Sequence, residues 1–215
     1  MERLQPQKDP AAIERRSFAI IDAEAGDPKP FSGLCWEVAR RLVHTTADFS
    51  ILDNLIISDA AVLAGVTALR EGRPVFTDTR MALAGVPERR LTPLGVKAAC
   101  LLTLPGVAER AQKAGITQSR AAVELAGDLL ENAILAVGNA PTTLIALIQY
   151  LREGGKAPAL VIGMPVGFVN AAESKELLLE ETGLHSIVIR GRRGGSPLAA
   201  ATVNALAEIA LRGRA

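Results

Sequence analysis

The chain has 215 residues, 49% of them hydrophobic, which is enough for one sizeable core, and we expect a single domain over residues 1–215. Its 24 basic and 23 acidic residues nearly cancel and aromatic residues make up only 3%, so the composition argues against nucleic acid as a partner. The longest apolar stretch, 157–169, is interrupted by prolines and is shorter than the roughly 20 residues that span a bilayer, so no membrane partner is expected.

The two cysteines, Cys35 and Cys100, lie far apart and outside any CxxC or Cys/His cluster. A zinc site or redox pair is therefore not expected, and both residues are interpreted as small buried side chains. The first residues lack the basic-then-apolar order of a signal peptide. Together these features favour a cytoplasmic location.

Apolar residues at helical spacing, separated by short apolar runs that end in glycine or proline, predict alternating helices and strands. In chain order we expect helices over 11–25, 33–44 and 59–69, a strand over 74–77, a strand over 96–103, helices over 107–114 and 117–131, a strand over 133–137, a helix over 142–152, strands over 159–162 and 185–190, and a helix over 197–211. This alternation indicates an α/β fold, namely a three-layer α/β/α domain with a mainly parallel sheet of about five strands.

Four strand exits carry polar or glycine-rich sequence, at 77–80, 138–141, 165–175 and 190–196. The carboxyl ends of parallel strands meet at one edge of a sheet, which is where ligands bind in open α/β folds. We therefore expect these exits to converge on one pocket.

The third exit contains Gly163, Pro165 and Gly167 between a strand and a polar helix start. Such residues let the backbone approach a ligand closely, although an ordinary strand-to-helix connection has the same pattern. Lys175, with the two residues before it, either fixes this turn or contacts a ligand.

The fourth exit combines Arg190, Arg192 and Arg193 with two adjacent glycines and a helix start. Guanidinium groups and a helix N-terminus suit carboxylate or phosphate oxygens, so an anionic ligand is the natural inference; a solvated basic turn is the alternative. Neither a P-loop pattern nor a dinucleotide fingerprint is present.

His44 is the candidate for proton exchange, because histidine titrates near neutral pH. It is predicted to lie with Glu37, Arg40 and Arg41 on the helix face away from the core, whereas His185 is interpreted as a packing residue. No serine nucleophile elbow is present, and no second carboxylate can be paired with Asp78 for glycoside hydrolysis.

Segments spread over almost the whole chain resemble one known family, the precorrin-8X / cobalt-precorrin-8 methylmutases of corrinoid biosynthesis. The segments, in the family's order, are 14–21, 43–49, 77–82, 138–142, 165–175, 190–196 and 200–206. The resemblance implies a homodimeric isomerase that moves a methyl group from C11 to C12 of a tetrapyrrole. It also implies a site near the subunit interface and no cofactor, since any cobalt belongs to the substrate.

Within this resemblance His44 corresponds to the catalytic histidine, which exchanges a proton with the macrocycle, and Ser17 to a substrate-contacting serine. No residue is expected to bind a metal or cofactor. The residues expected to bind the substrate are Arg16, Ser17, Thr77, Asp78, Thr79, Ser119, Arg120, Gly138, Asn139, Pro165, Val166, Gly167, Phe168, Lys175, Arg192, Arg193, Gly194 and Gly195.

The chain departs from the family pattern at Gln118, where arginine is common, and at Asn170, where glycine is usual. Asparagine tolerates the left-handed backbone region, so the second change is compatible with the turn. The sequence of residues 44–49 resembles the cobalt-dependent branch more than the other. A tetrapyrrole-binding protein without turnover is the alternative function; without the resemblance, the site would suggest an α/β enzyme for a phosphorylated or carboxylated metabolite.

Overall fold

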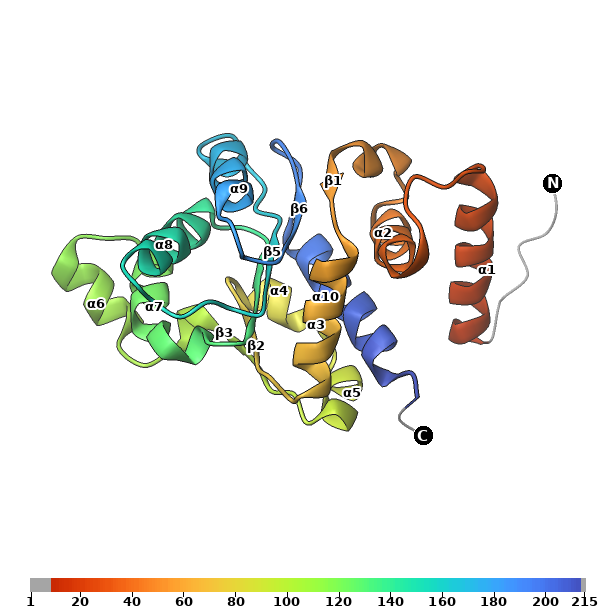
Figure 1. Ribbon diagram of the computed structural model, residues 1–215. Coiled ribbons are helices and arrows are strands. Elements are labelled where there is room, and N and C mark those ends of the chain that lie inside the picture. Colours follow the sequence, from red (N-terminus) through yellow and green to blue (C-terminus); the bar gives the residue numbers. More distant parts are fainter. Residues whose placement is uncertain (1–8, 214–215) are drawn as a thin grey trace.

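The computed structural model describes residues 9–213 and contains one six-stranded sheet between two layers of helices (Figure 1). The strands are β1 (Leu55–Ile56), β2 (Val75–Thr77), β3 (Ala98–Cys100), β4 (Ile134–Val137), β5 (Leu160–Gly163) and β6 (Ser186–Ile189), in the order β1-β6-β5-β4-β2-β3. All neighbours are parallel except β1, which runs antiparallel to β6. The expected three-layer, mainly parallel α/β fold is confirmed.

The helices divide between the two faces of the sheet (Figure 1). On one face lie α2 (Gly33–Thr46), α3 (Asp59–Arg70), the short α4 (Arg80–Ala84) and α5 (Glu88–Leu91), and α10 (Ser196–Leu211). On the other lie α6 (Val107–Ala114), α7 (Gln118–Ala126), α8 (Pro141–Arg152) and α9 (Ala171–Glu180). No helix within residues 9–213 is long and apolar enough to cross a membrane.

The central strands are apolar at every position because both of their faces are covered. In β4, Ile134 and Ala136 join the core beneath α2, α3 and α10, whereas Leu135 and Val137 join the core beneath α6 to α9. Successive side chains of a strand point to opposite faces, so continuous apolar runs supply both cores. This is why the central strands were readable from the sequence.

Two predicted elements are shorter than expected. The helix predicted over 117–131 ends at Ala126 and continues as a 3₁₀ turn over Gly127–Leu130, because Gly127 adopts a positive φ of 45°. The strand predicted over 96–103 is limited to β3, since Leu101–Thr103 form another 3₁₀ turn. The sixth strand, β1, was missed because it has only two residues.

The first helix, α1 (Pro10–Glu24), lies outside the three layers and packs on α2 (Figure 1). Only Ile21 of this helix is buried, whereas Ile13 and Ile20 are exposed. Apolar burial therefore contributes little to the placement of α1, and its polar contacts with α2 matter correspondingly more.

Candidate functional site

The four strand exits with unusual sequence lie side by side. The strands that precede them, β2, β4, β5 and β6, are consecutive parallel neighbours in the sheet. Hydrogen bonds also join the exits, from the Gly195 N–H to the Met164 carbonyl at 2.8 Å and from the Gly167 N–H to the Arg192 carbonyl at 3.2 Å. The four exits therefore meet at one edge of the sheet as predicted, but only the third and fourth line a common cavity.

Asp78 joins the first two exits and is buried. Its carboxylate accepts the N–H groups of Gly138 at 3.0 Å, Asn139 at 2.7 Å and Ala140 at 2.8 Å. These amides precede α8, where free N–H groups and the helix dipole favour a negative charge. The expectation that Asp78 contacts the substrate does not fit this geometry, because the side chain is a buried cap inside the protein.

Two glycines of the predicted site are required by backbone packing. A Cβ atom on Gly138 would lie 2.6 Å from the Cα atom of Ser196, and one on Gly194 would lie 2.2 Å from the Met164 carbonyl oxygen. Both distances are far below van der Waals contact, so only glycine allows the exits to pack this closely. Gly163 likewise leaves room for Leu178, 2.6 Å from its ideal Cβ position, rather than for a ligand.

Lys175 and Thr77 are also buried within the protein. The Lys175 ammonium donates hydrogen bonds to the carbonyls of Ile189, Gly191 and Arg193 at 2.8, 2.7 and 2.7 Å. The Thr77 hydroxyl donates to the Thr79 carbonyl at 3.0 Å. Both donors are directed inward in this structure, which does not favour a direct substrate contact by either side chain, and Lys175 binds the turn instead.

The three arginines of the fourth exit differ in their partners. Arg190 forms an ion pair with Glu176 at 3.3 Å, and Arg193 forms a short ion pair with Asp48. Arg192 has no ion pair among residues 9–213, and its guanidinium lies 5.3 Å from the centre of the Phe168 ring. Arg192 is therefore the guanidinium of this turn that is available to an incoming anion.

A cavity of about 370 Å³, called here the arginine-turn cavity, lies in front of this exit. Most of the residues that were expected to bind substrate at the third and fourth exits line this cavity. Its lining residues are Thr46, Ile51, Val166, Gly167, Phe168, Arg192, Arg193, Gly194 and Leu198. Phe168 is 82% exposed, and Val169 next to it is 78% exposed, so an apolar lip borders the cavity.

His44 lies in the last turn of α2 and is half-buried. Its Nδ1 atom is 2.8 Å from the Ser17 hydroxyl of α1, and the Phe18 ring packs edge-on against the imidazole with a centroid distance of 5.2 Å. The hydrogen bond orients the ring through Nδ1, and Nε2 has no hydrogen-bond partner within residues 9–213. The structure thus brings Ser17 and His44 together.

A second cavity of about 320 Å³, called here the His44 cavity, contains this imidazole. Its lining is rich in cations and small side chains. The lining residues are Arg41, His44, Thr45, Gly85, Pro87, Arg89, Arg90, Pro197, Ala200, Ala201 and Asn204. Thr45 here is adjacent in α2 to Thr46 of the arginine-turn cavity, and Pro197 is adjacent in α10 to Leu198, so both cavities lie against the same two helices.

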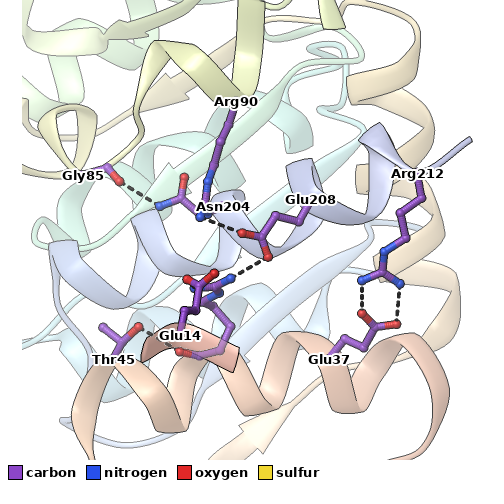
Figure 2. A network of polar contacts seen from close by, with 9 residues as sticks. Glu14, Glu37, Thr45, Gly85, Arg90, Asn204, Glu208 and Arg212 are labelled. Atoms are coloured by element: carbon purple, nitrogen blue, oxygen red, sulfur yellow. Dashed lines mark hydrogen bonds and ion pairs between the residues drawn. The ribbon is translucent and has the colours of Figure 1, made fainter. Parts of the chain in front are cut away.

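Arg41 is the main departure from the predicted helix face, because it is only 6% exposed. It donates to Glu14 of α1 and to Glu208 of α10, each at 2.5 Å, and Arg90 of α5 binds the other oxygen of Glu208 at 2.6 Å. Figure 2 shows this ion chain between the helices, beside the Asn204 side chain, which donates to the Gly85 carbonyl at 2.8 Å. The positions of Glu14, Glu208 and Arg90 beside His44 and Arg41 were not predicted from the sequence.

The Glu14–Arg41 ion pair and the Ser17–His44 contact have the same spacing along α1 and α2. Glu14 and Ser17 are three residues apart on α1, and their partners Arg41 and His44 are three residues apart on α2. Residues three apart lie on the same face of a helix, so one pair of facing helix surfaces carries both contacts. This spacing is a signal that the sequence contained, but the pairing of the two helices was needed to read it.

The electrostatic state of Glu14 reflects these neighbours. Burial raises the pKa of its carboxyl, but the hydrogen bond and charge of Arg41, with smaller effects of Arg90 and His44, outweigh burial and hold the pKa below its usual 4.5. Burial lowers the pKa of the Arg90 guanidinium, opposed by the charge of Glu208, yet an arginine remains protonated at physiological pH. The ion chain of Glu14, Arg41, Glu208 and Arg90 therefore consists of alternating negative and positive charges.

The other predicted site residues lie elsewhere or outside the cavity linings. Ser119 and Arg120 belong to α7, where Arg120 is paired with Glu124 at 3.0 Å and lines a separate cavity with Thr142. Arg16 is exposed on α1 next to Ser17. The remaining positions are Thr79, whose hydroxyl is 3.0 Å from that of Ser196, the exposed Asn139, and the buried Pro165 and Gly195. Residues 9–213 contain no cluster of three His, Cys, Asp or Glu residues suited to a metal.

Comparisons with known proteins agree on one family. A family model described as precorrin-8X methylmutase matches residues 12–209. A cobalt-precorrin-8 methylmutase of Leptospira interrogans is 40% identical over 90% of this chain and 91% of its own length, and a precorrin-8X methylmutase of Pseudomonas aeruginosa is 42% identical over 93% and 96%. The crystal structure of precorrin-8x methyl mutase from Thermus thermophilus superposes with a TM-score of 0.88 at 45% identity, covering 94% of this chain and 97% of that one.

The ion chain predicts a specific pH dependence of stability. Because the pKa of Glu14 is lower in the folded than in the unfolded chain, its contribution is complete above about pH 4.5 and is lost as the pH falls through the lower folded value. Glu14→Gln should reduce the free energy of unfolding by about 1 kcal/mol at pH 7, and the difference from wild type should shrink in acid. Urea unfolding between pH 3 and pH 7 measures both effects.

Glu109→Gln is the matched control, because Glu109 is exposed on α6 and belongs to no ion pair among the described residues. It should change stability by a few tenths of a kcal/mol at most. A Glu14→Gln variant with wild-type stability at pH 7 would show that the ion chain does not stabilise the packing of α1 against α2.

Proposed function

The chain belongs to the precorrin-8X methylmutase family, and from that premise we propose that it moves a methyl group from C11 to C12 of (cobalt-)precorrin-8, giving a hydrogenobyrinate-type corrin. The observation that carries this proposal is the 2.8 Å contact between Ser17 and His44 Nδ1, beside a cavity lined by arginines. It supplies one oriented acid/base group where the family's chemistry calls for one.

The proposed reaction is an intramolecular rearrangement, formally a 1,5-sigmatropic shift. The bond between the methyl carbon and C11 breaks as the bond to C12 forms, and the ring double bonds shift, so substrate and product have the same atoms. His44 Nε2 protonates a ring nitrogen or carbon and recovers a proton from the product tautomer, leaving no net change. Such a reaction requires a held tautomer and a proton carrier, and the proposal includes no cofactor.

Ser17 has a positioning role in this proposal. A histidine ring whose Nδ1 is held by a hydroxyl presents Nε2 in a defined direction, and Phe18 limits tilting of the ring.

The two cavities fit a large substrate with an apolar ring and acidic side chains. Together they offer cationic groups, among them Arg192 and Arg89, beside apolar surfaces of Ile51, Phe168 and Leu198. Arginines bind carboxylates with charge-assisted hydrogen bonds, while apolar walls suit the ring itself. Relatives named for the cobalt-bearing and for the cobalt-free substrate are about equally similar, so the cobalt branch rests on the sequence of residues 44–49 alone.

We expect His44→Ala to lower turnover of precorrin-8 by at least two orders of magnitude, because a positioned acid/base group contributes about that much. Binding of the product hydrogenobyrinic acid should change less than threefold. Ser17→Ala should lower kcat by about tenfold, because the imidazole remains but is less well oriented. The change in the visible absorption spectrum measures turnover.

The same assay separates the two candidate functions. A wild-type protein that binds the pigment but returns it unchanged would be the corrinoid-binding alternative. Turnover by His44→Ala at the wild-type rate would remove the histidine from its proposed role.

A second prediction concerns the unpaired arginine. Arg192→Ala should weaken binding of hydrogenobyrinic acid about three- to tenfold at low ionic strength, with a smaller loss at high salt, because screening weakens exposed charge pairs. Arg190→Ala is the control on the same turn, since that guanidinium is already paired with Glu176. Equal affinities for wild type and Arg192→Ala at low salt would exclude Arg192 from the site.

We also propose a homodimer in which the second subunit covers the apolar lip, a role supported by the exposure of Phe168 and Val169. Val169→Asp should shift the protein from dimer toward monomer in sedimentation experiments, because a charge at an apolar contact is costly to bury. Ile13→Asp, on the outer face of α1, is the control and should leave a dimer. A wild-type protein that sediments as a monomer at micromolar concentration would contradict the proposal.

A further inference from the structure

Lys175 is an unusual lysine, because it is 0% exposed and has no ion pair among the described residues. Its ammonium instead donates to three carbonyl oxygens, that of Ile189 at the end of β6 and those of Gly191 and Arg193 in the fourth strand exit, at 2.7 to 2.8 Å. Long charged side chains are almost never fully buried without compensation. Here the compensation comes from backbone carbonyls of the turn that bears the arginines and of the strand residue that precedes it.

Only the charged form of this side chain can make all three contacts. An ammonium has three N–H donors, whereas a neutral amine has two and would face the third carbonyl with its lone pair. Burial lowers the pKa of Lys175 to about 8, opposed by the charge of Glu176 on the same helix. Glu176 is itself paired with Arg190 of the turn, so the ammonium has no dedicated counter-ion.

The contacts with Lys175 also determine which backbone N–H groups of the turn point away from the protein interior. In a trans peptide the C=O and N–H groups point in opposite directions. Because the carbonyls of Gly191 and Arg193 point to Lys175, the N–H groups of Arg192 and Gly194 point away from it. Neither N–H has a hydrogen-bond partner within residues 9–213, and both residues line the arginine-turn cavity.

We propose that Lys175 is a positioning residue for substrate binding: its ammonium holds the 190–194 turn so that the Arg192 side chain and the free amides face the substrate's acidic groups. This inference rests on the proposed function. Lys175 does not touch the substrate; it acts through the turn. Converging N–H groups of a turn form a concave surface that suits anions, and Arg192 adds a full charge beside them.

The test removes the charge and the three N–H donors while keeping an unbranched side chain that is only one atom shorter. In Lys175→Met we expect the dissociation constant of hydrogenobyrinic acid to rise at least tenfold at low salt, and KM for precorrin-8 to rise with it. The kcat value should change less than threefold, because His44 and Ser17 lie on other helices. A variant with unchanged affinity, or with a loss confined to kcat, would overturn the proposal.

Two control variants separate positioning from general destabilisation. Ser174→Ala alters the adjacent buried residue of α9, whose hydroxyl donates to the Ala171 carbonyl and not to the turn. Leu178→Ala leaves a cavity further along the same helix and should lower stability without touching the turn. Both should bind hydrogenobyrinic acid within threefold of wild type; a tenfold loss in either would indicate that any damage to α9 weakens binding.

A double-mutant cycle tests whether Lys175 acts through Arg192. If it does, Lys175→Met combined with Arg192→Ala should bind no more than about twofold more weakly than Lys175→Met alone, since interacting residues are not additive. Fully multiplicative losses would show that the two residues act independently and would contradict the proposed route.

The wild-type protein offers a test that needs no variant. Between pH 7 and 9.5 the ammonium loses the proton needed for its third contact, so affinity for hydrogenobyrinic acid should fall as the pH passes about 8. Lys175→Met should lack this decline. Constant wild-type affinity over the range would count against the positioning role even if Lys175→Met failed to fold.

Hydrogen exchange distinguishes failure of this inference from failure of the proposed function. The amides of Arg190 and Gly195 flank the turn and are hydrogen-bonded to the carbonyls of Asn54 and Met164, each at 2.8 Å. Both should exchange faster in Lys175→Met and not in Ser174→Ala, whether or not any corrin binds. Unchanged exchange would refute the positioning role, whereas faster exchange in a protein that binds no corrin would refute only the proposed function.

Discussion

Burial of the Arg41 guanidinium between two carboxylates is the interaction on which the His44 site depends. It joins α1, α2 and α10 at one point, and Arg90 extends the chain of charges to α5. The placement of α1 matters because this helix carries Ser17 yet buries only one residue of its own. Because the Arg41 residue is only 6% exposed, losing a carboxylate partner would leave its charge less well compensated, so the ion chain favours a single arrangement of these helices.

A second buried cation, Lys175, has the corresponding role at the fourth strand exit. Arg41 holds helices together by binding carboxylates, whereas Lys175 holds a turn by binding carbonyl oxygens. Arg192 lines the cavity next to the turn, and Arg89 lines the His44 cavity. The two cavities lie against the same ends of α2 and α10. This arrangement suits an isomerase of the precorrin-8X methylmutase family, because a rearrangement requires a firmly held substrate.

The sheet was largely predictable, since β2, β4, β5 and β6 are apolar runs closed by glycine, proline or polar residues. What the sequence could not reveal depended on distant partners. Arg41 reads as a surface residue of an amphipathic helix because Glu208, which makes its burial possible, lies 167 residues away. The sequence predicts Lys175 to be an ordinary lysine near the start of a helix, because the backbone carbonyls that bind it cannot be recognised from residue types. The roles of Ser17 and His44 came from family resemblance, and their contact at 2.8 Å came from the structure.

The central claim is that His44, oriented by Ser17, faces the reacting ring carbons. A crystal structure of the protein with hydrogenobyrinic acid tests it most directly. We predict that Nε2 lies about 3 Å from a ring atom close to C11 or C12, with Nδ1 still hydrogen-bonded to Ser17 and Arg192 beside an acidic side chain of the corrin. A corrin bound away from α2, for example against Arg120, with His44 facing solvent, would contradict it.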